Sequence, residues 1–209
     1  MKSKKLKSIC AIIVLLAFIQ ILLFVIQQGV FLLVPRTDYS DHMAAMLGMI
    51  VLTICISITA RKQGINLSVF PARFSKVYVC ASILAAILLI ATPSNYTGSI
   101  QPITLLVYSS IVTPVFEELI FRGFVWNKLN AVFSNKWKTY ITSTVLFALW
   151  HFGYISSIAF RVNEGLLQAM MWKVLTGLCF GIVLGIVRLK TKNCYSTILL
   201  HGVINIFGR

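Results

Sequence analysis

Acidic residues are scarce in this sequence, and their scarcity sets the first limits on its function. Only 5 of the 209 residues are Asp or Glu, against 19 Lys or Arg, and 11% of the chain is charged. Soluble domains carry about 25% charged residues, so this composition argues against a soluble domain. With 58% hydrophobic residues, the chain has the balance of a protein that crosses a membrane several times.

Several other features are missing. The five cysteines are scattered and show neither CxxC nor zinc-type spacing, so we expect small buried hydrophobic side chains and no disulfide framework. Neither HExxH nor GxSxG occurs, which excludes ordinary zincins and serine hydrolases. No internal repeat, low-complexity tract or linker divides the chain. The cysteines are Cys10, Cys55, Cys80, Cys179 and Cys194.

Long apolar runs fill most of the sequence. Because a helical span needs about 20 apolar residues, the runs predict an all-α, polytopic membrane bundle of about seven transmembrane helices. The first run follows a group of lysines, but it is too long for a signal peptide and lacks a clear cleavage site, so we interpret it as a retained span. The predicted spans are 9–34, 43–60, 76–92, 101–121, 139–160, 166–187 and 194–208.

Basic residues alternate between the predicted loops. Most of them precede the first span or fall after the second, fourth and sixth spans, whereas the opposite loops hold only Arg36 and Arg161. The positive-inside rule therefore predicts a multi-pass protein of the cell membrane, with its N-terminus in the cytoplasm and its C-terminus outside. Clusters that flank apolar runs are typical of membrane proteins in a lipid bilayer, so we expect no nucleic-acid partner.

A carboxylate pair stands out within the fourth run. Glu117 and Glu118 are flanked by apolar residues, and charges at membrane depth cost a few kcal/mol each, so their presence indicates function. Glu118 and Arg122 are four residues apart and can pair on one helix face, while Glu117 points about 100° away and is free to act as a base. Pro114 can loosen the local helix. The alternative is a helix-end charge cluster at the cytoplasmic surface.

Two later runs carry histidines. His151 follows Phe147 by one helical turn, and His201 precedes Asn205 by one turn. A histidine and an amide on one face can donate hydrogen bonds to a developing oxyanion. The alternative for either motif is a hydrogen bond that only holds neighbouring helices together.

We assign no chemical role to the other polar or small residues. Gly177, Gly181 and Gly185 recur every four residues and predict close helix packing. We expect His42 to be solvated in an outer loop, and we assign no reaction to Lys173 or Gln27.

Together the polar residues lie on three different predicted spans. A carboxylate and an imidazole can activate a water molecule, with or without a metal. Two rival hypotheses stay open: a membrane protein that keeps these residues only for helix packing, and a small transporter with Glu117 and Glu118 as a proton relay. The second lacks an evident inverted repeat.

The three motifs, in their order and separation, resemble those of the CPBP family of CAAX-protease and bacteriocin-processing intramembrane endopeptidases, also called the Abi family. They are Glu-Glu-x-x-x-Arg at 117–122, Phe-x-x-x-His at 147–151 and His-x-x-x-Asn at 201–205. The resemblance covers about residues 100–208. It divides the single membrane domain into N-terminal helices over 1–100 and a protease-like core over 101–209.

The resemblance implies peptide-bond hydrolysis in a site that opens toward the cytoplasmic leaflet. It implies that Glu117 and His151 activate the water, that Glu118 and Arg122 orient the first motif, and that His201 and Asn205 stabilise the oxyanion. The need for a metal is unsettled in the family, and a divalent ion such as zinc would have Glu117, His151 and His201 as candidate ligands.

The resemblance also suggests partners. We expect a small peptide or a membrane protein as substrate, since bacterial relatives are linked to peptide maturation and bacteriocin self-immunity. The alternative function is a non-enzymatic immunity or regulatory protein that retains the motifs structurally. Relatives commonly have an eighth helix after the last motif, so we expect either a weakly anchored last helix or a site completed by another copy in a homo-oligomer.

Overall fold

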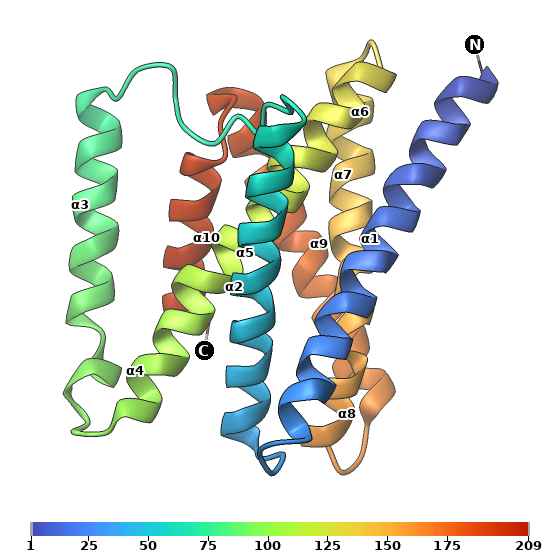
Figure 1. Ribbon diagram of the computed structural model, residues 1–209. Coiled ribbons are helices and arrows are strands. Elements are labelled where there is room, and N and C mark those ends of the chain that lie inside the picture. Colours follow the sequence, from blue (N-terminus) through green and yellow to red (C-terminus); the bar gives the residue numbers. More distant parts are fainter. Residues whose placement is uncertain (1, 209) are drawn as a thin grey trace.

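The computed structural model describes the backbone of residues 2–208 and the side chains of residues 5–208, and this part of the chain contains helices and no strands. The helices pack as a bundle whose long members run roughly in parallel (Figure 1). The α-helices are α1 Lys2–Phe31, α2 Asp38–Lys62, α3 Lys76–Ala91, α4 Ile100–Val107, α5 Thr113–Glu118, α6 Trp126–Val132, α7 Lys136–Trp150, α8 Ile155–Arg161, α9 Leu166–Thr191 and α10 Tyr195–Phe207.

The expected membrane helices are all present in the described residues. Five helical segments are long and apolar enough to cross a bilayer: 5–31, 38–62, 100–132, 136–161 and 166–191. The predicted spans 76–92 and 194–208 correspond to α3 and α10, which have only 16 and 13 residues. The predicted helical membrane bundle is therefore confirmed, with two helices shorter than a full span.

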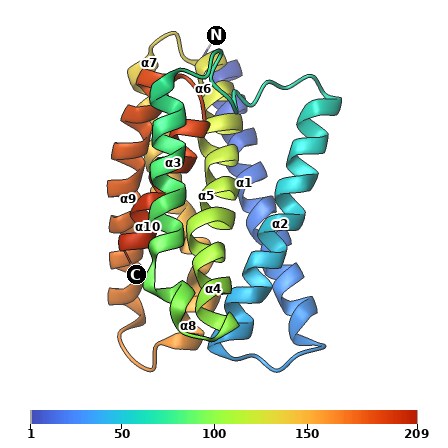
Figure 2. The ribbon, with the colours of Figure 1, turned by 90° about the vertical axis from the view of Figure 1, so that its left-hand side faces the viewer.

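The central element is a helical rod from Ile100 to Val132, which continues eleven residues beyond the predicted span 101–121. It comprises α4, α5 and α6, joined by π-helical turns at Tyr108–Val112 and Leu119–Val125. In Figure 2 the rod lies between α1 and α2 on one side and α9 and α10 on the other. Pro114 falls between the two turns, and π-helical turns of this kind are frequent at functional sites.

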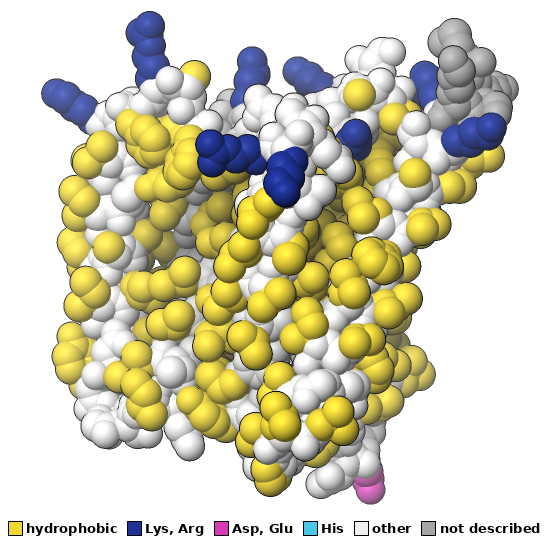
Figure 3. Space-filling view, viewed as in Figure 1, with side chains coloured by type: hydrophobic (Ala, Val, Ile, Leu, Met, Phe, Trp, Pro, Cys, Tyr) yellow, Lys and Arg dark blue, Asp and Glu magenta, His cyan; other side chains and the backbone are white. Residues whose placement is uncertain are grey.

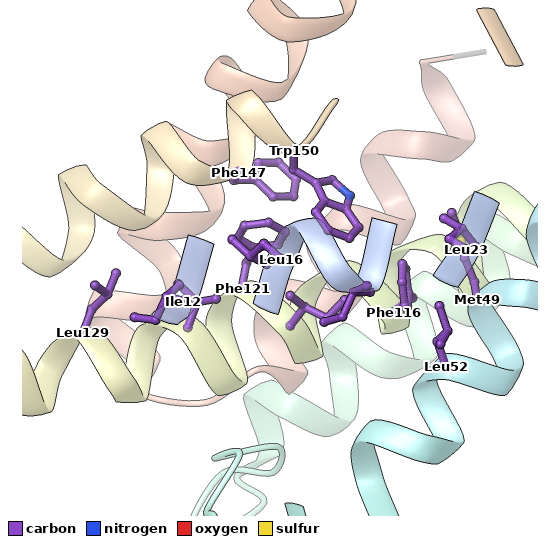
Figure 4. Packing of buried hydrophobic residues seen from close by; sticks show 13 residues of the cluster. Ile12, Leu16, Leu23, Met49, Leu52, Phe116, Phe121, Leu129, Phe147 and Trp150 are labelled. Atoms are coloured by element: carbon purple, nitrogen blue, oxygen red, sulfur yellow. The ribbon is translucent and has the colours of Figure 1, made fainter. Parts of the chain in front are cut away.

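An apolar core holds the rod against its neighbours. Phe116, Phe121 and Leu129 of the rod pack with Phe147 and Trp150 of α7 (Figure 4). The same cluster includes residues of α1 and α2, among them Leu16, Leu23 and Met49. Burial of a large apolar side chain contributes about 1.5–3 kcal/mol, so this core fixes the rotation of the rod and hence the direction of its glutamates.

Lys and Arg side chains gather at the end of the bundle where the N-terminus lies (Figure 3). This basic end contains the start of α1 and the loops after α2, α6 and α9. Two residues assigned to these loops are instead buried in helices: Arg122 is 1% exposed and Arg188 is 4% exposed. The rod and α9 extend further than their apolar runs suggest, because buried partners compensate the two charges.

The cysteines form no disulfides within the described residues. The expectation that they are buried is wrong for four of them, since only Cys194 is buried while Cys10, Cys55, Cys80 and Cys179 lie on outward helix surfaces. An apolar sequence run does not distinguish the core face of a membrane helix from the face that meets lipid.

Candidate functional site

Glu118 and Arg122 form a buried ion pair on the rod. Arg122 Nη1 donates to Glu118 Oε1 at 2.9 Å, as the four-residue spacing predicts. His201 Nδ1 lies 3.0 Å from the same Glu118 oxygen, and the Arg122 guanidinium stacks over the Phe147 ring at 4.2 Å. Since Glu118 is 0% exposed and the helical rod continues to Val132, the alternative of a surface charge cluster at a helix end is wrong.

Glu117 points to the other side, toward a cavity. Its Oε1 accepts a 2.6 Å hydrogen bond from the Tyr154 hydroxyl, and its Oε2 lies 3.9 Å from His201 Nε2. The Tyr154 hydroxyl in turn accepts from Trp150 Nε1 at 3.0 Å. The two neighbouring glutamates therefore have different surroundings, with Glu118 held by Arg122 and His201 and Glu117 facing the cavity.

His151 lies where α7 ends and a 3₁₀ turn, His151–Tyr154, begins. The His151 backbone N–H bonds to Ala148 and Leu149, which leaves the Phe147 carbonyl to the imidazole Nδ1 at 2.9 Å. A carbonyl oxygen can only accept, so Nδ1 carries the proton and Nε2 of the neutral ring is an acceptor. The turn thereby fixes the tautomer that a general base needs.

Helix α9 approaches His151 at a glycine, Gly177. A Cβ at Gly177 would lie 2.5 Å from His151 Nδ1, and one at Gly181 would lie 3.0 Å from the Thr144 methyl. Thr144 Oγ1 also donates to the Gly181 carbonyl at 3.1 Å. The predicted close packing of the glycine series is confirmed, and at Gly177 it also borders the site.

Asn205 contacts the rod at the Ser109 carbonyl, five residues before Pro114. In the π-helical turn, the Thr113 N–H bonds to the Tyr108 carbonyl, five residues earlier. The next carbonyl in this register, that of Ser109, would need an N–H from residue 114, and proline has none. Asn205 Nδ2 donates to this carbonyl at 2.7 Å.

A cavity of about 330 Å³ joins these elements. Its wall includes Glu117, His151, His201 and Asn205, whereas Glu118 and Arg122 lie behind it. The cavity then continues past Lys173 and Tyr154 to Asp41, His42 and Arg161, and none of its described lining residues belongs to the basic end. The resemblance implied an opening toward the basic end, but this cavity extends toward the opposite one.

A charged cluster lies at the far part of the cavity. Arg36 and Arg161 share the buried carboxylate of Asp41, at 2.7 Å and 3.3 Å. Arg161 Nη1 also lies 2.6 Å from His42 Nε2, and His42 Nδ1 lies 2.6 Å from the Asp38 carbonyl. His42 was expected in a solvated loop. It belongs instead to α2, as the fifth residue of the helix, and lines the cavity.

The candidate metal ligands do not form a metal centre. Among the described residues, no group of three or more His, Cys, Asp or Glu side chains is arranged to hold an ion. Glu117 Oε2 and His201 Nε2 lie 3.9 Å apart, and His151 keeps Nε2 free as a ligand atom, but the three side chains do not form such a group. We therefore derive no reaction step through a metal.

The structure thus brings all six predicted site residues together at one depth of the bundle, four in the cavity wall and two behind it. Sequence reasoning missed Tyr154 and Arg188. Arg188 Nε donates to the Arg122 carbonyl at 2.8 Å. A tyrosine three residues after His151 was a usable signal, because a buried hydroxyl usually finds a partner.

Comparison with known proteins places these residues in a family context. The family model described as type II CAAX prenyl endopeptidase Rce1-like matches residues 99–207, which include all six. The UPF0177 protein YxdF of Lactococcus lactis is 28% identical over 98 residues, 47% of this chain and 44% of that protein. The match thus spans less than half of that relative. No solved structure matches.

Proposed function

Because the chain belongs to the Rce1-like family of type II CAAX prenyl endopeptidases, we propose that it hydrolyses a peptide bond of a small peptide or membrane-protein substrate within the membrane. The observation that carries this proposal is the cavity shared by Glu117, His151 and His201, which come from three separate helices. These imidazole and carboxylate groups line one cavity although the three residues are far apart in the sequence. This arrangement favours a reaction over helix packing alone.

In the proposed reaction, Glu117 takes a proton from a water molecule whose oxygen attacks the peptide carbonyl. His151 assists through Nε2, since its Nδ1 is committed to Phe147. The C–N bond then breaks, and the proton held by Glu117 passes to the departing amine nitrogen. Tyr154 would orient the Glu117 carboxylate by its 2.6 Å hydrogen bond, so that the second oxygen faces the cavity.

The remaining motif residues have supporting roles in this proposal. Glu118 is anchored by Arg122 and holds His201 through Nδ1, so that Nε2 of His201 faces the cavity. Asn205 uses one of its two N–H groups for Ser109 and keeps the other for the oxyanion. A preorganised donor of this kind is worth about 10²–10³ in kcat.

We further propose that the basic end is cytoplasmic and that the protein lies in the cell membrane. The clustering of Lys and Arg at one end of the bundle supports this orientation. The cavity would then open away from the cytoplasm, so the scissile bond would be reached from the outer leaflet.

The first test is the substitution Glu117→Gln. Glutamine keeps the acceptor for Tyr154 but is a far weaker base, so we expect the loss of about 10²-fold or more in activity, since general-base catalysis contributes about 10²–10⁴. Peptide profiles of membranes with the wild-type chain and with Glu117→Gln would show which fragments disappear.

The matched control is Glu164→Gln, which removes an acid in the loop between α8 and α9, outside the cavity. It should leave the fragments unchanged. Identical fragments from wild type and Glu117→Gln, at equal amounts of membrane protein, would refute the proposed reaction and favour the packing-only alternative.

A further inference from the structure

Lys173 is a cation inside an apolar span. It belongs to none of the three sequence motifs and takes no part in the proposed reaction. It lies seven residues into α9, about 10 Å from the start of the helix. Its side chain lines the cavity, with Nζ 5.8 Å from the centre of the Tyr154 ring. The described ion pairs do not include Lys173, so no carboxylate of the described chain neutralises it.

Arg161 adds a second positive charge to the same cavity. It and Arg36 both depend on the single carboxylate of Asp41, and Arg36 makes the shorter contact, at 2.7 Å against 3.3 Å. The outer part of the cavity therefore contains more positive than negative charge, while the inner part ends at Glu117. A cation in an apolar span is costly unless it reaches water or a partner, and the exposed Lys173 has no carboxylate partner among the described ion pairs.

We infer that Lys173, with Arg161 beyond it, binds a carboxylate of the peptide substrate. This inference rests on the proposed function, because a peptide offers no other common anion. A carboxylate seated on Lys173 would direct the chain inward past Tyr154, so that a backbone carbonyl reaches Glu117. The carboxylate can be the C-terminus of the peptide or an acidic side chain, and both would meet the same charge.

Binding can be measured without cleavage in the Glu117→Gln chain, purified in lipid nanodiscs. The probes are dansyl-Gly-Leu-Leu-Leu as the free acid, its C-terminal amide, and the amide with the last leucine replaced by glutamate. Fluorescence anisotropy gives the Kd of each, and empty nanodiscs correct for partition into lipid. We expect the amide to bind about tenfold more weakly than the free acid, as for loss of a hydrogen bond to a charged group.

The second substitution, Lys173→Gln, should bring the Kd values of acid and amide together, whereas Lys173→Arg should keep their difference. Lys190→Gln is the matched control, because it removes the same charge from the other end of α9, outside the cavity. The probe with glutamate separates the two sources: tight binding only of the free acid identifies the C-terminus, and tight binding of both identifies a carboxylate at either position.

The inference is overturned if neither the free acid nor the glutamate probe binds more tightly than the amide, if none of the three probes binds, or if Lys173→Gln behaves like Lys190→Gln. The proposed function fails separately, when the chain with Glu117 intact yields the same membrane peptides as Glu117→Gln. The binding measurement therefore tests the role of Lys173, and the cleavage measurement separately tests the proposed hydrolysis.

Discussion

At the scale of single residues, the candidate site depends on how each polar atom is oriented. Glu117 and Glu118 are adjacent, yet one faces the cavity and the other an arginine and a histidine. The helical spacing predicted the second pairing, because residues four apart share a face. It could not predict Tyr154, whose contact with Glu117 arises from a 3₁₀ turn between α7 and α8.

The contribution of that contact can be tested by Tyr154→Phe. The substitution removes only the hydroxyl that donates to Glu117 Oε1, so the carboxylate loses its fixed orientation. We expect kcat to fall about tenfold, the equivalent of 1.4 kcal/mol, with a smaller change in KM. Tyr140→Phe is the control, because that hydroxyl donates at 3.3 Å to Ile182, away from the cavity. Equal kcat values for the two variants would contradict the role of Tyr154.

At the scale of elements, the rod and α10 are joined by the contact between Asn205 and the Ser109 carbonyl. The motif spacing places His201 and Asn205 on one face of α10, which the structure confirms. Neither π-helical turn was predictable from that spacing, since each depends on which carbonyls lack an N–H partner in the folded rod. The proline at 114 gave only a hint of local irregularity.

A double-mutant cycle tests this account of the rod. In the parent chain, Asn205→Leu should lower the free energy of unfolding by about 0.5–1.5 kcal/mol, because the hydrogen bond from Asn205 Nδ2 to the Ser109 carbonyl is lost. In a Pro114→Ala background, the restored N–H can serve that carbonyl, so the same substitution should cost less. Thermal or denaturant unfolding in one detergent would measure both. Additive effects of the two substitutions would mean that Pro114 and Asn205 act independently.

At the scale of the whole molecule, the sequence predicted the helical bundle, the positions of its apolar helices and the gathering of basic residues at one end. Hydrophobic runs carry that information directly. The direction of the cavity was not predictable, because α2 lines it together with α8, α9 and α10, which lie far from α2 in the chain. Lys173 and His42 acquire their place from that packing alone.

The proposed orientation can be checked with single cysteines. After replacement of the four exposed cysteines by serine, Asn163→Cys should react in intact cells with a membrane-impermeant maleimide, and Asn130→Cys only after permeabilisation. The first position lies in the loop between α8 and α9, and the second near the basic end of the rod. Cys194 can stay, because its side chain is buried and its thiol donates to the Leu67 carbonyl at 3.3 Å. Labelling in the reverse order would invert the assigned orientation.

The contact between His151 Nδ1 and the Phe147 carbonyl has a consequence for proton traffic. One nitrogen of the ring is tied to its own helix, so in the proposed reaction protons can join and leave this imidazole only at the other. Every proton that His151 takes up or releases is therefore exchanged with the contents of the cavity, and none passes through Nδ1 to the helix behind it. In the proposed reaction, His151 therefore exchanges protons on one side only and does not relay them across the bilayer.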